Sequence, residues 1–229
     1  MVLSVIGVSD EERERALQLW EVADADSTTI EHAGRLPANY MRFRMDEREA
    51  RQVRTLDTVL VPGLLQTSAY ASANAAVGTE LLFDDWDSTA EAAERRDRQN
   101  LIHRQEDPLS LHALIDEVAL RRVVGGPDVM VEQIEYLSKM ASLPHVTIQV
   151  IPLAVGSYGV TAGPLVLLRF PEDDEPDSAY VESLLGMHMV ENQQNARVLS
   201  NAWDHVARLA LSPDETGRFI DEARDWMTR

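Results

Sequence analysis

The spacing of apolar residues changes once along the chain, near Pro108, and this change limits the folds that the chain can form. Ahead of Pro108 the apolar side chains recur at helical intervals. After it they alternate with polar residues, which is typical of a strand with one buried face; the apolar positions are Leu109, Leu111, Ala113 and Ile115. The sequence therefore predicts an α+β fold, in which a helical N-terminal half leads into a mixed β-sheet of about four to five strands flanked by helices.

Helices are predicted for almost the whole first half. Apolar stripes and turn residues place them at residues 11–23, from Pro37 to about Arg54, after Thr67, and at residues 88–105. In a capping box, a Ser side chain accepts from the N3 amide and a Glu side chain returns to the cap amide. Such boxes mark three helix starts: Ser9 with Glu12, Ser88 with Glu91, and Ser212 with Glu215.

The second half is predicted to alternate strands with helices. Its expected elements are a strand at 109–116, a helix at 127–141, strands at 146–150, 165–170, 179–185 and 187–190, and two closing helices. The run at 165–170 is apolar almost throughout, which indicates a central strand covered on both faces. Trp20, Trp203 and Trp226 lie on apolar helix stripes and are interpreted as core residues. We divide the chain into a helical lead-in, residues 1–54, and an α+β effector or ligand-binding domain, residues 55–229.

The charge of the chain restricts its partners. Asp and Glu number 39 against 21 Lys and Arg, which gives a formal net charge of −18. Such a chain repels phosphates on average, so we expect no direct contact with nucleic acid by this chain alone. A basic partner protein would suit its charge better. The oligomeric state, including a homodimer, is left open.

Several classes of protein are excluded by what the sequence lacks. It has no apolar run of the roughly 20 residues that cross a membrane, and no basic segment ahead of an apolar one at its start, so we expect a cytoplasmic protein without a membrane segment. It has no cysteine, and none of the phosphate-loop, dinucleotide, nucleophile-elbow or HExxH motifs occurs. We therefore predict no metal site and no cofactor.

Ionisable side chains interrupt the predicted strands and suggest a binding recess. Arg169 and Glu182 lie in apolar strands, where each would cost several kcal/mol if it were buried without a partner. They are expected to pair with each other, with a ligand or with water. The glycine-containing loop at 156–163 is interpreted as a lid. The predicted ligand-binding residues are His112, Asp116, Gln149, Tyr158, Arg169, Tyr180, Glu182 and Met187; a solvated face or an internal ion pair remains the alternative.

A second charged group follows the first strand of the second half. Glu117, Arg121 and Arg122 lie where that strand ends, and we predict that they face a partner protein.

Five sequence strings occur in an order that resembles a known family. They are LVPGLLQT at 60–67 followed by SAYA, LIDEVALRR at 114–122, VTIQVIP at 146–152, GPLVLLRF at 163–170, and LALSP at 209–213. Together they resemble the domain of unknown function, also described as antitoxin-like, that follows an XRE-type helix-turn-helix in Streptomyces-type transcriptional regulators. The segment at 5–12 is similar to the junction where the DNA-binding half of such regulators ends, so the helix-turn-helix is expected to be mostly absent.

The resemblance implies a regulatory domain that senses a small molecule or a short companion protein. The alternative is a stand-alone enzyme that performs acid/base chemistry, such as a cyclisation or isomerisation, in a biosynthetic pathway. In that case Asp116 or Glu182 would act with His112 or Tyr158.

Overall fold

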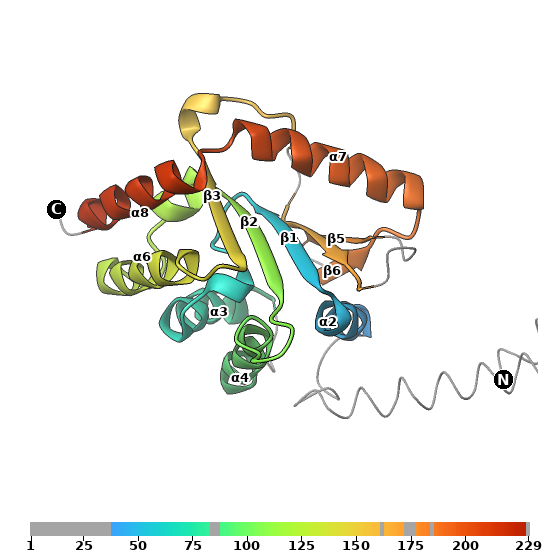
Figure 1. The fold of residues 1–229 in the computed structure, drawn as a ribbon. Helices are drawn as coiled ribbons and strands as arrows, with labels where there is room; N and C mark the ends of the chain where they lie inside the picture. The colour runs from blue at the N-terminus through green and yellow to red at the C-terminus, as the bar shows by residue number, and fades with distance from the viewer. Residues whose placement is uncertain (1–37, 83–87, 161–162, 172–176, 184–185, 228–229) are drawn as a thin grey trace, which may run out of the picture.

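The computed structural model describes residues 38–82, 88–160, 163–171, 177–183 and 186–227, and in this part the chain forms a six-stranded mixed sheet between two layers of helices (Figure 1). The predicted α+β class is confirmed, with slightly more strands than expected. The predicted helix at 11–23, its capping box at Ser9 and the side chain of Trp20 lie outside the described residues, as do the side chains of the capping box at Ser88.

The elements have the following bounds. The helices are α2 (Ala38–Glu49), α3 (Ser68–Leu82), α4 (Ser88–Asn100), α5 (Glu117–Arg121), α6 (Pro127–Ala141), α7 (Gln193–Leu209) and α8 (Pro213–Met227), with short 3-10 turns η2 (Gly63–Leu65) and η3 (Leu153–Val155). The strands are β1 (Gln52–Asp57), β2 (Ser110–Asp116), β3 (Val146–Ile151), β4 (Leu165–Arg169), β5 (Ser178–Ser183) and β6 (Gly186–Met189). No helix of the described residues is long and apolar enough to cross a membrane.

The strands follow the order β3-β2-β1-β4-β5-β6, so the first strand of the sheet lies near its middle. β1, β2 and β3 are parallel, and their C-terminal ends share one edge of the sheet. β4 runs antiparallel to β1, and β5 and β6 continue the antiparallel half.

Each face of the sheet carries its own core. The larger core packs the side chains of one face, such as Val53 and Ile148, against α2, α3, α6 and α8. The smaller core packs Leu56, Leu114 and Leu167 against Trp203 of α7. Figure 1 shows α7 lying along one face of the sheet and α2, α3, α4 and α6 on the other.

Both outer strands are protected. At the free edge of β3, Leu211 N donates to Val150 O at 2.9 Å, and Val150 N donates to Thr216 Oγ1 at 3.0 Å. At the other edge, β6 packs against α2. The backbone groups of the edges are therefore less open to pairing with another chain.

The main error of the sequence prediction is β1. The helix expected to run to about Arg54 ends at Glu49, and residues 52–57 form a central strand. The strand was not recognised because its sequence lacks the apolar alternation of a half-buried strand. Three of its polar residues, Arg54, Thr55 and Asp57, are buried in the folded protein. The division that we proposed after residue 54 falls inside this strand.

Most other elements agree with the prediction. Helix α6 has the predicted bounds, and Thr67 Oγ1 accepts from Tyr70 N at 3.2 Å at the start of α3. The capping box at Ser212 is formed, with Ser212 N donating to Glu215 Oε2 at 2.9 Å and Glu215 N donating to Ser212 Oγ at 3.3 Å. Strand β4 is covered on both faces, and Trp203 is buried as expected.

We predict that Gly163→Ala destabilises the fold. A Cβ at residue 163 would lie 2.5 Å from the backbone oxygen of Glu182, so β4 and β5 would have to separate where β4 begins. The expected loss in the free energy of unfolding is about 1–3 kcal/mol, measured by urea denaturation. Gly217→Ala in α8 is the matched control: its Cβ would meet nothing within 4 Å, and a gain of about 0.5–1 kcal/mol is expected. Equal effects at the two positions would contradict the prediction.

Candidate functional site

The sheet separates the residues that we predicted to form one recess. His112, Gln149 and Arg169 project from the face that α7 covers, as does Asp116. Tyr180, Glu182 and Met187 project from the opposite face. Of the three alternatives expected for Arg169 and Glu182, pairing with each other is therefore wrong. Alternation assigns faces within one strand only, and the pairing register, which places Leu165 beside Val181, decides how the faces of two strands correspond.

His112 is held within the smaller core. Its Nε2 lies 2.7 Å from Gln149 Oε1, and Gln149 Nε2 donates to Leu211 O at 2.8 Å. The imidazole lies edge-on to the Trp203 ring, with 4.7 Å between centroids. Burial lowers the pKa of His112, and Gln149 only partly opposes this effect. His112 and Gln149 were correctly placed together by their alternation, but their polar groups are used internally.

Asp116 and Tyr158 also bond to each other. Asp116 Oδ1 accepts from Val118 N at 2.9 Å and so caps α5, while Oδ2 accepts from Tyr158 Oη at 2.8 Å. Burial and the Asp116 carboxylate both raise the pKa of Tyr158. Of the acid/base pairs proposed from the sequence, Asp116 with Tyr158 is therefore in contact, whereas Leu114 separates Asp116 from His112 on β2 and Glu182 lies on the opposite face.

The remaining predicted residues have structural contacts. Arg169 is half-exposed and pairs with Asp177, with Nε 3.2 Å from Oδ1. Tyr180 is buried against Phe43, and its hydroxyl donates to Asp46 of α2. Met187 is buried in the larger core.

Of the three residues expected to face a partner, two are exposed. Arg121 and Arg122 lie on the surface, whereas Glu117 is buried. Glu117 Oε2 accepts from Leu153 N at 2.8 Å, and its other oxygen pairs with Arg121. The Arg121 guanidinium also lies over the Trp226 ring, 4.0 Å from its centroid.

The edge where β1, β2 and β3 end is a topological switch point. The chain leaves β1 towards the larger core, where Leu64 and Leu65 are buried. The loop that precedes β4 packs Val155 and Tyr158 on the smaller core instead. In open α/β sheets, ligands bind where the connections diverge in this way at the C-terminal ends of parallel strands.

Asp57 is the residue at this switch point that sequence reasoning missed. Its side chain is 8% exposed, and Oδ2 has no hydrogen-bond partner in the structure as described. Burial raises the pKa of the Asp57 carboxyl to about 7. The negative charge of Glu182 raises this pKa further, whereas the Thr55 side chain and, more weakly, the positive charge of Arg98 lower it. The only signal in the sequence was the strand-favouring composition of residues 53–56, which would have put Asp57 at a strand end.

Three other buried side-chain oxygens are also unsatisfied. Within the described ranges, Thr55 Oγ1, Gln66 Oε1 and Glu94 Oε2 lack a hydrogen-bond partner. Gln66 follows η2, and its backbone oxygen accepts from Gln99 of α4. An unmet buried polar group costs roughly 1–3 kcal/mol, unless water or a ligand completes it.

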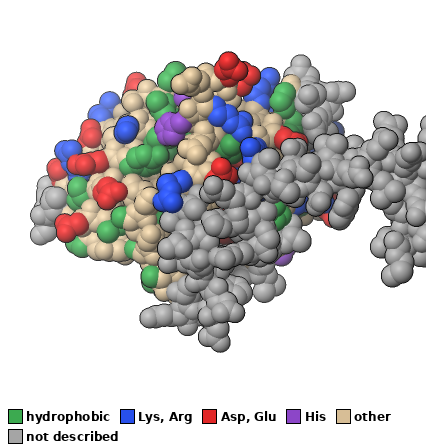
Figure 2. Space-filling model, turned by 90° about the horizontal axis from the view of Figure 1, so that it is seen from below, with side chains coloured by type: hydrophobic (Ala, Val, Ile, Leu, Met, Phe, Trp, Pro, Cys, Tyr) green, Lys and Arg blue, Asp and Glu red, His purple; other side chains and the backbone are tan. Residues whose placement is uncertain are grey.

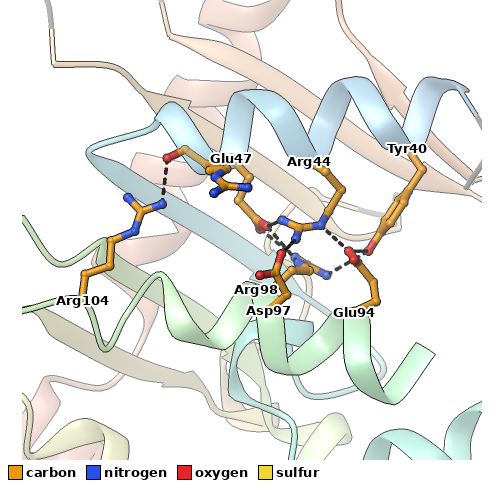
Figure 3. A network of polar contacts seen from close by, with 8 residues as sticks. Tyr40, Arg44, Glu47, Glu94, Asp97, Arg98 and Arg104 are labelled. Atoms are coloured by element: carbon orange, nitrogen blue, oxygen red, sulfur yellow. Dashed lines mark hydrogen bonds and ion pairs between the residues drawn. The ribbon is translucent and has the colours of Figure 1, made fainter. Parts of the chain in front are cut away.

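A buried charge network joins α2 to α4 beside this site. Figure 3 shows Arg44, Glu47, Glu94 and Arg98 turned towards one another from the two helices. Arg44 Nη1 lies 3.0 Å from Glu47 Oε2, and Arg98 Nη2 lies 2.7 Å from Glu47 Oε1. Arg44 also pairs with Glu94 and, at 2.7 Å, with Asp97. Arg44 and Glu47 are 1% and 0% exposed, so the network replaces the water that both have lost.

Arg98 connects this network to the switch point. A Cβ on Gly63 of η2 would lie 3.0 Å from Arg98 Nη1 and 3.1 Å from Arg95 Nη1. Arg98 also donates through Nε to Glu47 Oε2 at 2.9 Å. It therefore lies between the turn that follows Asp57 and the buried charges of α2.

A shallow cavity of about 470 Å³ opens on the same edge of the sheet. Val118, Arg121, Arg122 and Val123 line it. On the face seen from below in Figure 2, Lys and Arg side chains are interspersed with Asp and Glu. In the described part of the chain, no group of His, Asp and Glu side chains could hold a metal ion.

Comparison with known proteins gives one result. A family model described as "Domain of unknown function (DUF5753)" matches residues 40–222. No curated protein and no solved structure matches the chain. The matched range begins in α2 and ends in α8, so it includes the switch point and the charge network.

We predict that Asp57→Asn changes how stability depends on pH. The unfolded carboxyl releases its proton near the ordinary pKa of 3.8 and the folded one at about 7, so the wild type loses stability as pH rises through this range. The Asn variant lacks this loss. By urea denaturation, the variant should gain about 1 kcal/mol relative to the wild type at pH 4.5, and this gain should rise to about 4 kcal/mol at pH 8. Asp107→Asn, in an exposed loop, is the control; an Asp57→Asn difference that is constant with pH would refute this assignment.

We also predict that Arg44→Met destabilises the domain by about 3 kcal/mol, because Glu47 and Glu94 would keep their buried charges with fewer partners. Arg169→Met removes a half-exposed pair and should cost at most about 1 kcal/mol. The measurement is chemical denaturation of both variants. A smaller effect for Arg44 than for Arg169 would show that the network is solvated.

Proposed function

Because the chain belongs to the DUF5753 family, whose description assigns no activity, we propose its function from its own residues: it is a regulatory domain that binds a small molecule at the edge where β1 and β2 end. The observation that supports this proposal is the buried carboxyl of Asp57, which lies at the switch point and whose Oδ2 lacks a partner among the described residues.

A small molecule suits this site better than a companion protein does. Asp57, Thr55, Gln66 and Glu94 are each 8% exposed or less, so the flat surface of another protein would not reach their unmet oxygens. A ligand that enters the edge would supply those hydrogen bonds. The destabilising burial of Asp57 is then the cost of a site that is formed before its ligand arrives.

Binding would be transmitted through Arg98. This side chain contacts η2 on one side and pairs with Glu47 of α2 on the other, so a ligand that attracts or displaces it would change the charge balance of α2. α2 is the first described helix and leads back towards the N-terminal segment. Such a domain would act by shifting its contacts with whatever α2 is joined to.

The wider role in this proposal is that of the effector domain of a cytoplasmic, Streptomyces-type XRE regulator. It is supported by the five sequence strings and their order. A second candidate is an enzyme, which the pKa of Asp57, about 7, would favour, because general acids and bases work best near the ambient pH. Asp57 would then be the proton-transfer group in place of Asp116 and His112, whose polar atoms are bonded internally.

The proposal is tested by thermal unfolding of the full chain with pooled metabolites. Binding stabilises the folded state, so at least one pool should raise the Tm of the wild type. It should also raise that of Asp204→Asn, a control on the opposite face, but not that of Asp57→Asn. A pool that shifts all three proteins equally, or no active pool at all, would contradict the proposal. Mass spectrometry of the active pool after incubation separates the two roles, since only an enzyme consumes its ligand.

A further inference from the structure

The two kinds of polar group at this edge define the class of ligand. Resting on the proposed function, we propose that the ligand is a small zwitterion of the amino-acid class, with its ammonium group at Asp57 and Thr55 and its carboxylate at Arg122.

The Asp57 end of the site calls for hydrogen-bond donors. The unmet groups are oxygens: Asp57 Oδ2 and Thr55 Oγ1 lie two residues apart on the same face of β1, and Gln66 Oε1 lies in the turn that follows. A carboxylate can only accept, and an ammonium group offers three donors. The negative charge of Glu182, which is felt at Asp57, adds to the attraction for a cation.

The Arg122 end calls for an anion. Its guanidinium lines the shallow cavity with Val118 and Val123, and it forms no ion pair with a carboxylate of the described residues. Arg121 beside it differs, because it is paired with Glu117 and stacked on Trp226. A free guanidinium next to apolar walls binds a carboxylate in a two-pronged geometry.

Helix α3 contacts both chain segments that carry the two ends. Val61, in the turn after Asp57, donates its N–H to Tyr70 Oη at 3.3 Å. One turn further along α3, Ala73 touches the segment that carries Arg122, since a Cβ on Gly125 would lie 2.7 Å from Ala73 Cβ. The charges of both ends reach the Tyr70 hydroxyl: Arg122 lowers its pKa and Asp57 raises it, although burial is the largest effect.

Ligands with a single charge fit less well. A simple amine would leave Arg122 without a counter-charge. A simple anion would face the carboxyl of Asp57, while the guanidinium whose charge acts on Asp57, that of Arg98, is already bound to Glu47 through two nitrogens. A zwitterion satisfies both ends.

The test uses isothermal titration of the full chain at pH 8, where Asp57 is ionised. The probes are glycine, L-alanine, β-alanine and γ-aminobutyrate, which span different separations of the two charges, with methylamine and acetate as single-charge fragments. We expect at least one amino acid to bind, and methylamine and acetate to bind at least tenfold more weakly. Asp57→Asn and Arg122→Met should each weaken the binding at least tenfold. Asp204→Asn and Arg208→Met, on α7, are the matched controls and should leave it unchanged.

Each other outcome overturns the inference. If a metabolite from the thermal screen binds through Asp57 but carries only one charge or none, the ligand class is wrong and the proposed function stands. If amino acids bind but Arg122→Met has no effect, the carboxylate site is wrong. If neither the pools nor the probes bind, and a high-resolution structure shows only ordered water at Asp57 and Gln66, both the inference and the proposed function fail.

Discussion

The hydrogen-bonded register between β1 and its two neighbours determines where every other feature lies. β1 is parallel to β2 on one side and antiparallel to β4 on the other, so the sheet changes from a parallel to an antiparallel half at its centre. The chain leaves β1 on one face, and the connection from β3 to β4 crosses on the other. Asp57, the last residue of β1, is therefore placed where the two connections diverge, and the candidate site follows from this position.

The buried ionisable side chains of this protein differ in whether they have ion-pair partners. Arg44 and Glu47 are completely enclosed, and ion pairs from two helices replace their lost hydration. Asp57 is nearly as buried but has no such compensation, so its carboxyl holds its proton to a higher pH. Asp57 lies outside the network that pairs Arg44 and Glu47, so its burial retains an energetic penalty. Binding of a ligand is the physical process that would remove that penalty.

The elements that sequence reasoning placed well are those defined by local signals. The bounds of α6 follow from the turn at Gly125 and Gly126 and from the helical spacing after it, and the start of α8 follows from the capping box at Ser212. His112 and Gln149 were both named as ligand-binding residues, but the contact between them appears only in the structure, where their strands pair. The predicted recess failed as a unit, because its members were assigned to one face without knowledge of how β2, β4 and β5 pair. Asp57 was not found because β1 itself was not recognised.

By itself, then, the sequence determined the α+β class, the helices with clear caps and the strands with clean alternation, since periodicity and capping depend on neighbours within a few residues. Only the tertiary structure decided that β1 is central, that Arg169 and Glu182 lie on opposite faces, and that Asp57 Oδ2 is enclosed without a hydrogen-bond partner. These facts depend on pairing between strands that are far apart in the chain and on helices that bury polar groups against the sheet. A side chain's burial and its partners are properties of that assembled environment, which the local pattern around the residue does not contain.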